Sequence, residues 1–210
     1  MDNGQTVTLA DRTAKIFSIV FHPFMLPVYG MVIILMAPTL YNYIPFEVKK
    51  LIVMILLINN VLLPLSLLPF FVHRNIISSW SMEERKDRSI PLALSTFLYA
   101  TTTYILFRFP VPYFLKSYCL AVAFLALAAT IINFWWKISV HAIGAGMILA
   151  LVLVLAFKMY TPLVWFIVPA VLAGGIILSS RLRLELHSPA QVWIGYLAGI
   201  VGFSLVIFLI

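Results

Sequence analysis

The sequence predicts an all-α protein, a polytopic membrane helical bundle of six to seven transmembrane helices. Hydrophobic residues make up 63% of the 210 residues, charged residues only 10%, and the mean hydropathy is +1.08. Soluble domains are about half apolar, and a helix needs about 20 mostly apolar residues to cross the hydrocarbon core. We therefore expect residues 1–210 to form one integral membrane domain, multi-pass in a cell membrane.

Seven apolar runs have the length of a membrane span. They cover residues 16–40, 51–72, 90–108, 114–135, 140–157, 162–179 and 189–210. The first run contains Pro23, Pro27 and Pro38, so the alternative of six spans omits it. The polar residues 1–15 do not have the order of a cleaved signal, and we expect the first run to be retained.

If all seven runs cross, the loops 73–89, 136–140 and 180–188 share one face with the N-terminus. All four histidines also fall at this face, namely His22, His73, His141 and His187. Each loop ends in a helix-start pattern, Ser89 with Pro91, Ser139, and Ser188 with Pro189. The free N–H groups of helix N-termini bind phosphate readily. The sequence thus predicts three such ends at one membrane surface.

Charge and composition restrict the partners. The net charge is +7, but the bases are scattered over loop ends instead of forming the basic face typical of nucleic-acid binding. We expect bilayer lipids, including an anionic lipid substrate, and no nucleic acid. Beyond Asp87 the only acidic side chain is Glu185, so a site in the C-terminal half is expected to work without a metal or another cofactor. Cys119 is the only cysteine and can form no intramolecular disulfide.

Two histidines and an arginine carry the predicted chemistry. His187 precedes the helix start at Ser188, where a neutral imidazole can attack phosphorus. An alkoxide leaves well only if it is protonated as it departs, and His141 can supply that proton. Arg181, together with the basic cluster Arg85-Lys86-Asp87-Arg88, offers donors for the phosphate oxygens.

The spacing of these residues resembles a known family. Ser180-Arg181-x5-His187, continued by Gln191-Val192-x-x-Gly195-x-x-x-Gly199, is similar to the third signature of the type 2 phosphatidic acid phosphatase superfamily. Ser139-Val140-His141 resembles the second signature, usually Pro-Ser-Gly-His. The resemblance covers about residues 80–200, the expected motif-bearing core, and its third signature is the most specific part.

The resemblance implies a role for each matching position. His187 matches the nucleophile that becomes phosphohistidine, and His141 matches the general acid. The implied phosphate-binding positions are Arg181, Ser180, Ser139, the backbone at Val140, and Arg88 of a poorly matched first signature, with Lys86 or Arg85 as substitutes. Gln191 stands where the family has an aspartate that supports the nucleophile. Because an amide adds no negative charge, we expect reduced or altered activity.

The expected function is therefore a metal-independent membrane phosphatase acting on a lipid phosphate monoester or an isoprenoid diphosphate. One alternative is a non-catalytic lipid-phosphate binder or carrier of the same fold, and another is a small channel or structural membrane protein. Gly195 and Gly199 allow close helix packing, within the chain or in a homodimer. The resemblance implies a bacterial inner membrane as the expected location. The distribution of basic residues leaves open which side of the membrane the site faces.

Overall fold

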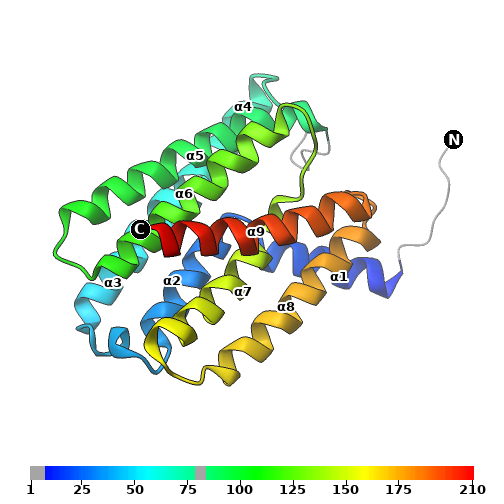
Figure 1. Cartoon of the computed structure of the whole chain (residues 1–210). Helices are drawn as coiled ribbons and strands as arrows, with labels where there is room; N and C mark the ends of the chain where they lie inside the picture. The colour runs from blue at the N-terminus through cyan, green and yellow to red at the C-terminus, as the bar shows by residue number, and fades with distance from the viewer. Residues whose placement is uncertain (1–7, 79–83) are drawn as a thin grey trace, which may run out of the picture.

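The computed structural model describes residues 8–78 and 84–210, and these residues are all-α, without a strand (Figure 1). The elements in order are α1 (Leu9–Val20), α2 (Leu26–Met36), the 3-10 helix η1 (Leu40–Tyr43), α3 (Phe46–Leu57), the π-helical turn η2 (Ile58–Leu62), α4 (Leu63–His73), α5 (Arg85–Arg108), α6 (Tyr113–Asn133), α7 (Val140–Met159), α8 (Val164–Arg183) and α9 (Pro189–Leu209). The first positions of the motif-bearing core, 80–83, lie outside the described residues.

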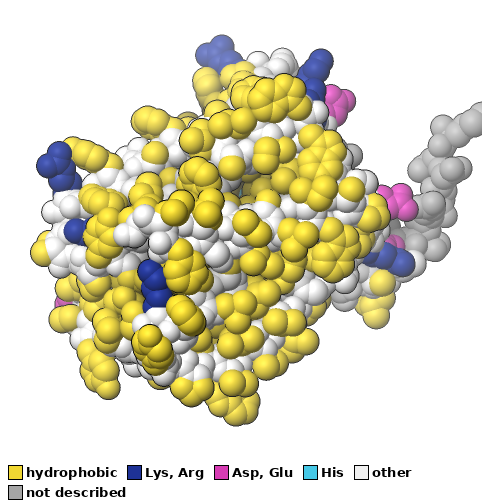
Figure 2. Space-filling view, in the orientation of Figure 1, with side chains coloured by type: hydrophobic (Ala, Val, Ile, Leu, Met, Phe, Trp, Pro, Cys, Tyr) yellow, Lys and Arg dark blue, Asp and Glu magenta, His cyan; other side chains and the backbone are white. Residues whose placement is uncertain are grey.

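Six helices of the described part are long and apolar enough to cross a membrane. They are the continuous segment Phe46–His73, formed by α3, η2 and α4, and the helices α5, α6, α7, α8 and α9. Hydrophobic side chains dominate the bundle surface in Figure 2, with few Lys and Arg among them. The chain is thus a multi-pass helical membrane protein, as its composition predicts.

The prediction of one span over residues 16–40 is wrong. This run breaks between Val20 and Leu26, because Pro23 offers no backbone N–H and disfavours the helical conformation at His22. With 11 residues, α2 is only about 16 Å long and too short to cross the hydrocarbon. The six-span alternative is the one that the structure supports.

Helix α1 instead packs against α8, as Figure 1 shows at the end of the bundle where α9 begins. A salt bridge of 2.9 Å joins Arg183 Nε, at the end of α8, to Asp11 Oδ1 near the start of α1. The outer side of α1 exposes Leu9, Ile16 and Ile19. These features are typical of a helix lying in the membrane interface.

Six crossings bring the end of α4, the start of α5, the end of α6, the start of α7, the end of α8 and the start of α9 to one side of the membrane. We call this side the motif face. Two of the three predicted helix starts on it are confirmed, since Ser139 caps α7 and Ser188 caps α9. The third is wrong, because α5 begins four residues before Ser89, after Glu84.

Helices α7 and α9 hold the motif face together by close backbone contact. A Cβ atom on Gly199 would lie 2.1 Å from the Ile143 carbonyl oxygen, and one on Gly146 would lie 2.1 Å from the Tyr196 carbonyl oxygen. Only glycine permits such an approach. Gly195 and Gly199 therefore serve packing within the chain, while a homodimer stays a prediction.

Candidate functional site

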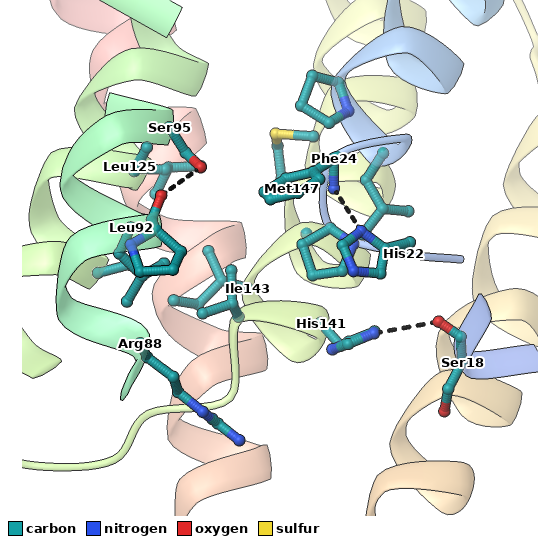
Figure 3. A pocket seen from close by; sticks show the side chains of 18 of the residues that line it. Ser18, His22, Phe24, Arg88, Leu92, Ser95, Leu125, His141, Ile143 and Met147 are labelled. Atoms are coloured by element: carbon teal, nitrogen blue, oxygen red, sulfur yellow. Dashed lines mark hydrogen bonds between the residues drawn. The ribbon is translucent and has the colours of Figure 1, made fainter. Parts of the chain in front are cut away.

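A cavity of about 620 Å³ opens at the motif face and reaches between the helices (Figure 3). Side chains of four predicted site residues line it, namely Arg88 from α5, His141 from α7, Arg181 from α8 and His187 before α9. These residues are up to 99 positions apart in the sequence. The fold thus brings two imidazoles and two guanidinium groups to one cavity.

The ring of His187 is held in a single tautomer by its neighbours. Its Nδ1 lies 3.2 Å from Gln191 Oε1, and the backbone N–H of Ser188 donates to the same oxygen at 3.1 Å. The contact with the Ser188 N–H identifies this atom as the amide oxygen, which can only accept. Nδ1 of His187 therefore carries a hydrogen and donates it. The Nε2 atom lies 3.2 Å from Arg88 Nη1, which can only donate, so Nε2 carries the lone pair.

Burial and positive charge keep this imidazole neutral. His187 is 7% exposed. Burial, followed by the charges of Arg88 and Arg181, lowers the pKa of His187 from 6.5 to about 3, although the hydrogen bond to Gln191 acts in the opposite direction. Its Nε2 therefore stays unprotonated across the physiological pH range.

His141 is oriented by α1. Its Nε2 lies 3.3 Å from the backbone oxygen of Ser18, as Figure 3 shows, and a carbonyl can only accept. Nε2 therefore carries a hydrogen, and Nδ1 is the other exchangeable position of the ring. The ring of His22 packs edge-on against His141, with their centroids 5.9 Å apart.

His22 follows α1, in the break before α2. Its Nδ1 accepts a hydrogen bond from the Phe24 backbone N–H at 3.3 Å. Burial, and to a lesser degree the charge of Arg181, lowers the pKa of His22 to about 4. His22 thus adds a third imidazole to the cavity and completes this wall beside His141.

Arg181 is a buried cation that lacks a full set of partners. Its side chain lies in the last turn of α8 and is 6% exposed. Nη1 donates to Ser18 Oγ at 3.3 Å, but Nε has no hydrogen-bond partner within the described residues. Because an unpaired buried donor is costly, a phosphate oxygen bound here would relieve a deficit in the fold.

Apart from Val140, the other predicted ligands lie away from the cavity lining. The Ser180 hydroxyl donates to the Ile176 carbonyl within α8 at 2.7 Å, and Ser139 is fully buried as the cap of α7. Arg85 donates to the Phe134 carbonyl, and Lys86 is exposed. Only Val140, of the remaining predicted positions, lines the cavity. Of the predicted cations, Arg88 and Arg181 are therefore the two that line the cavity.

The described residues hold no group of three or more His, Cys, Asp or Glu that could bind a metal ion. Metal-independent chemistry nevertheless stays a prediction, since it depends on how the bound substrate reacts.

Ser18 and His22 are among the cavity residues that were not predicted from the sequence as site residues. Ser18 contacts both His141 and Arg181, and His22 packs against His141. Neither belongs to a motif. The available signal for His22 was a histidine before Pro23 in an apolar run, which alone does not indicate a site.

The cavity is thus lined by three imidazoles, those of His22, His141 and His187, and by two guanidinium groups. Side chains of these kinds are used in phosphoryl transfer. No protein-family model, curated protein or solved structure matches the chain.

Proposed function

We propose that this protein is a metal-independent membrane phosphatase, similar to the type 2 phosphatidic acid phosphatases, acting on a lipid phosphate monoester or an isoprenoid diphosphate. The observation that carries the proposal is the placement of the His187 ring in the cavity, with Nδ1 3.2 Å from Gln191 Oε1 and Nε2 3.2 Å from Arg88 Nη1. An imidazole with a fixed Nδ1–H has its lone pair on Nε2, where it can attack phosphorus.

The proposed reaction has two steps. Arg88 and Arg181 bind the non-bridging phosphate oxygens, so that Arg88 leaves Nε2 of His187. Nε2 then forms a bond to phosphorus while the bond from phosphorus to the ester oxygen breaks, and that oxygen takes a proton from His141. Since Nε2–H of His141 is held by the Ser18 carbonyl, the transferred proton is a second one, carried by Nδ1. His141 must therefore enter this step as the imidazolium, a form that the negative charge of the bound phosphate favours.

In the second step, water attacks the phosphohistidine. His141 now accepts a proton from the water as the bond from Nε2 of His187 to phosphorus breaks, and inorganic phosphate is released. Gln191 supports the Nδ1–H throughout but adds no negative charge to the imidazole that develops positive character. The proposal therefore includes a turnover slower than that of a family member with aspartate at this position.

Release of inorganic phosphate in EDTA tests the proposal. The full chain, in nanodiscs, would be offered phosphatidic acid, phosphatidylglycerophosphate, a sphingoid phosphate and undecaprenyl diphosphate. We expect release from at least one of them, and a loss of about a thousandfold or more in His187→Ala, as is usual for removal of a nucleophile. The matched control is His73→Ala, an exposed histidine at the end of α4 that does not line the cavity.

Two results would contradict the phosphatase proposal, namely equal release by His187→Ala and the wild type, and no release from any of the four substrates. Trapping provides a second line of evidence. Rapid quenching of the wild type with labelled substrate is expected to leave a protein-bound phosphate that is stable in base and labile in acid, and His187→Ala is expected to leave none.

A non-catalytic lipid-phosphate binder is the second candidate function. Two observations favour it, the amide at Gln191 and the contact of Arg88 with the nucleophilic nitrogen of His187. A binder would retain phosphate ligands in EDTA without releasing inorganic phosphate. Its affinity would fall in Arg181→Gln, while His187→Ala would have little effect.

A further inference from the structure

The cavity continues from its cationic mouth into the interior of the bundle. Beyond Arg88 and His141 its lining is mostly apolar, with Leu92 and Leu125 on one side and Phe24 and Met147 on the other, as Figure 3 shows. The polar residues of this part are His22, Ser95 and Tyr99. The hydroxyl of Ser95 in this part is already bonded to the Pro91 carbonyl at 2.7 Å. The inner part, which we call the chamber, therefore suits a hydrocarbon.

The lining residues of α6 indicate how deep the chamber is. Ala129, Ala126 and Val122 line it at helical spacing, so they lie one above another along the helix. Seven residues of helix correspond to about 10 Å. On α5 the lining runs from Arg88 to Tyr99, about 16 Å along the axis. The chamber thus extends well into the hydrocarbon depth of the membrane.

The volume limits what the cavity can hold. An apolar cavity of about 150 Å³ holds one benzene molecule, with about six non-hydrogen atoms, so by the same ratio a cavity of about 620 Å³ takes roughly 20 to 25 non-hydrogen atoms. A phosphate group uses about five of them, which leaves room for one chain of roughly 15 to 20 carbons. A lipid with two acyl chains of ordinary length has more than twice this number of atoms.

We infer that the substrate carries its phosphate on a single apolar chain, and that this chain lies inside the bundle, in the chamber between α2, α5, α6 and α7. The inference rests on the proposed function for its phosphate end, at Arg88 and Arg181. It departs from the simpler expectation that lipid tails stay in the bilayer while the head group alone enters the protein.

Binding of non-hydrolysable alkylphosphonates tests the inference independently of turnover. Butyl, octyl, dodecyl and hexadecyl phosphonates would be titrated against the full chain in nanodiscs, with the same measurement on empty nanodiscs subtracted. In the wild type we expect affinity to rise by up to about fourfold for each added methylene until the chamber is full, and then to level off.

Chamber-filling variants show where the chain lies. Ala126→Phe is expected to stop the rise at a shorter chain while leaving butylphosphonate binding unchanged, and Ala126→Leu to set an intermediate limit if the larger ring impairs folding. The matched control is Leu127→Phe, one position along the same helix on its exposed side. This control is expected to retain the chain-length profile of the wild type.

A lipid phosphonate with two chains completes the test and is expected to bind at least tenfold more weakly than the one-chain compound of equal chain length. Affinity that does not depend on chain length, or that changes equally in Ala126→Phe and Leu127→Phe, would overturn the inference. If affinity depends on chain length but no substrate releases phosphate, the chamber inference stands and the phosphatase proposal is refuted. If phosphate is released but affinity does not depend on chain length, only the chamber inference is refuted.

Discussion

The two histidines of the cavity are held in opposite ways. His187 is fixed by its own helix, since Gln191 and Ser188 lie within four residues of it. His141 is held by Ser18, which lies 123 residues earlier in the chain on a different helix. The proposed nucleophile therefore depends on local structure, whereas the proposed general acid depends on how α1 docks.

The difference lies in what each support requires of the fold. The capping box of α9 needs only the first turn of that helix, because Ser188 and Gln191 accept hydrogen bonds from each other's backbone N–H groups. The contact of Ser18 forms only if α1 packs against α8, where the described contacts include an exposed salt bridge between Asp11 and Arg183. Exposed salt bridges contribute little to stability. The orientation of the acid is thus the more fragile of the two.

The largest expected effect comes from breaking the local support. Gln191→Ala removes the acceptor of Nδ1–H, so that His187 loses its fixed tautomer, and we expect turnover to fall by about a hundredfold to ten-thousandfold. The loss is expected on alkyl phosphates and on p-nitrophenyl phosphate alike, because the nucleophile acts on both. Steady-state phosphate release measures it.

Gln191→Glu is the matched variant, because it keeps the length of the side chain and its acceptor oxygen while adding a negative charge. We expect it to turn over at least as fast as the wild type. If Gln191→Ala turns over as fast as the wild type, the amide does not set the tautomer of His187. The claim that His187 depends on this local support would then be refuted.

A smaller effect is expected from breaking the long-range support. Ser18→Pro removes a backbone N–H within α1 and displaces the turn that carries the carbonyl accepting from His141. General acid catalysis contributes about a hundredfold to ten-thousandfold, and a misoriented acid loses part of it. We expect alkyl phosphate turnover to fall by about tenfold to a hundredfold, with less than threefold loss on p-nitrophenyl phosphate, whose leaving group needs no proton.

Ser18→Ala is the control for this variant. It keeps the backbone carbonyl and removes only the hydroxyl that accepts from Arg181, so it is expected to weaken phosphate binding modestly without the dependence on leaving group. Equal losses on both substrates in Ser18→Pro would show that α1 does not act through the acid.

The same contrast explains how much was predictable from the sequence. The six spans that contain long uninterrupted apolar runs were predicted, as were the caps at Ser139 and Ser188, because hydropathy and capping are local properties. The break after Val20 was visible only as prolines in an apolar run. The start of α5 was missed because Ser89 followed by Pro91 reads as a helix start, while the helix begins a turn earlier.

The candidate site divides in the same manner. Arg181, His187 and Gln191 follow one another at fixed spacing across the end of α8 and the start of α9, so their proximity could be predicted. Arg88 meets His187 only through the packing of α5. Ser18 and His22 come to the cavity through the docking of α1, and no pattern of residues encodes such a long-range contact.

The smallest expected effect concerns the pH dependence of stability. It compares His187, which has the local support, with His22, which comes to the cavity through the docking of α1. The folded-state pKa is about 3 for His187 and about 4 for His22, both below the ordinary value of about 6.5. At a pH between the folded-state pKa and about 6.5, the unfolded chain binds protons that the folded chain excludes. The contribution of these two histidines to stability is therefore fully present above about pH 6.5 and falls as the pH decreases. Between about pH 7 and about pH 5, each histidine is expected to remove roughly 2 kcal/mol.

The apparent unfolding midpoint in detergent measures this loss, with about 2–4 °C expected for each kcal/mol in a chain of this size. His187→Gln and His22→Gln should each flatten the decrease, and His73→Gln, at an exposed position, should leave it unchanged. If α1 detaches before the bundle unfolds, only His187→Gln will flatten the midpoint, because His22 will already be hydrated when the helices separate. An equal slope in all four proteins would mean that neither imidazole is kept neutral by the fold.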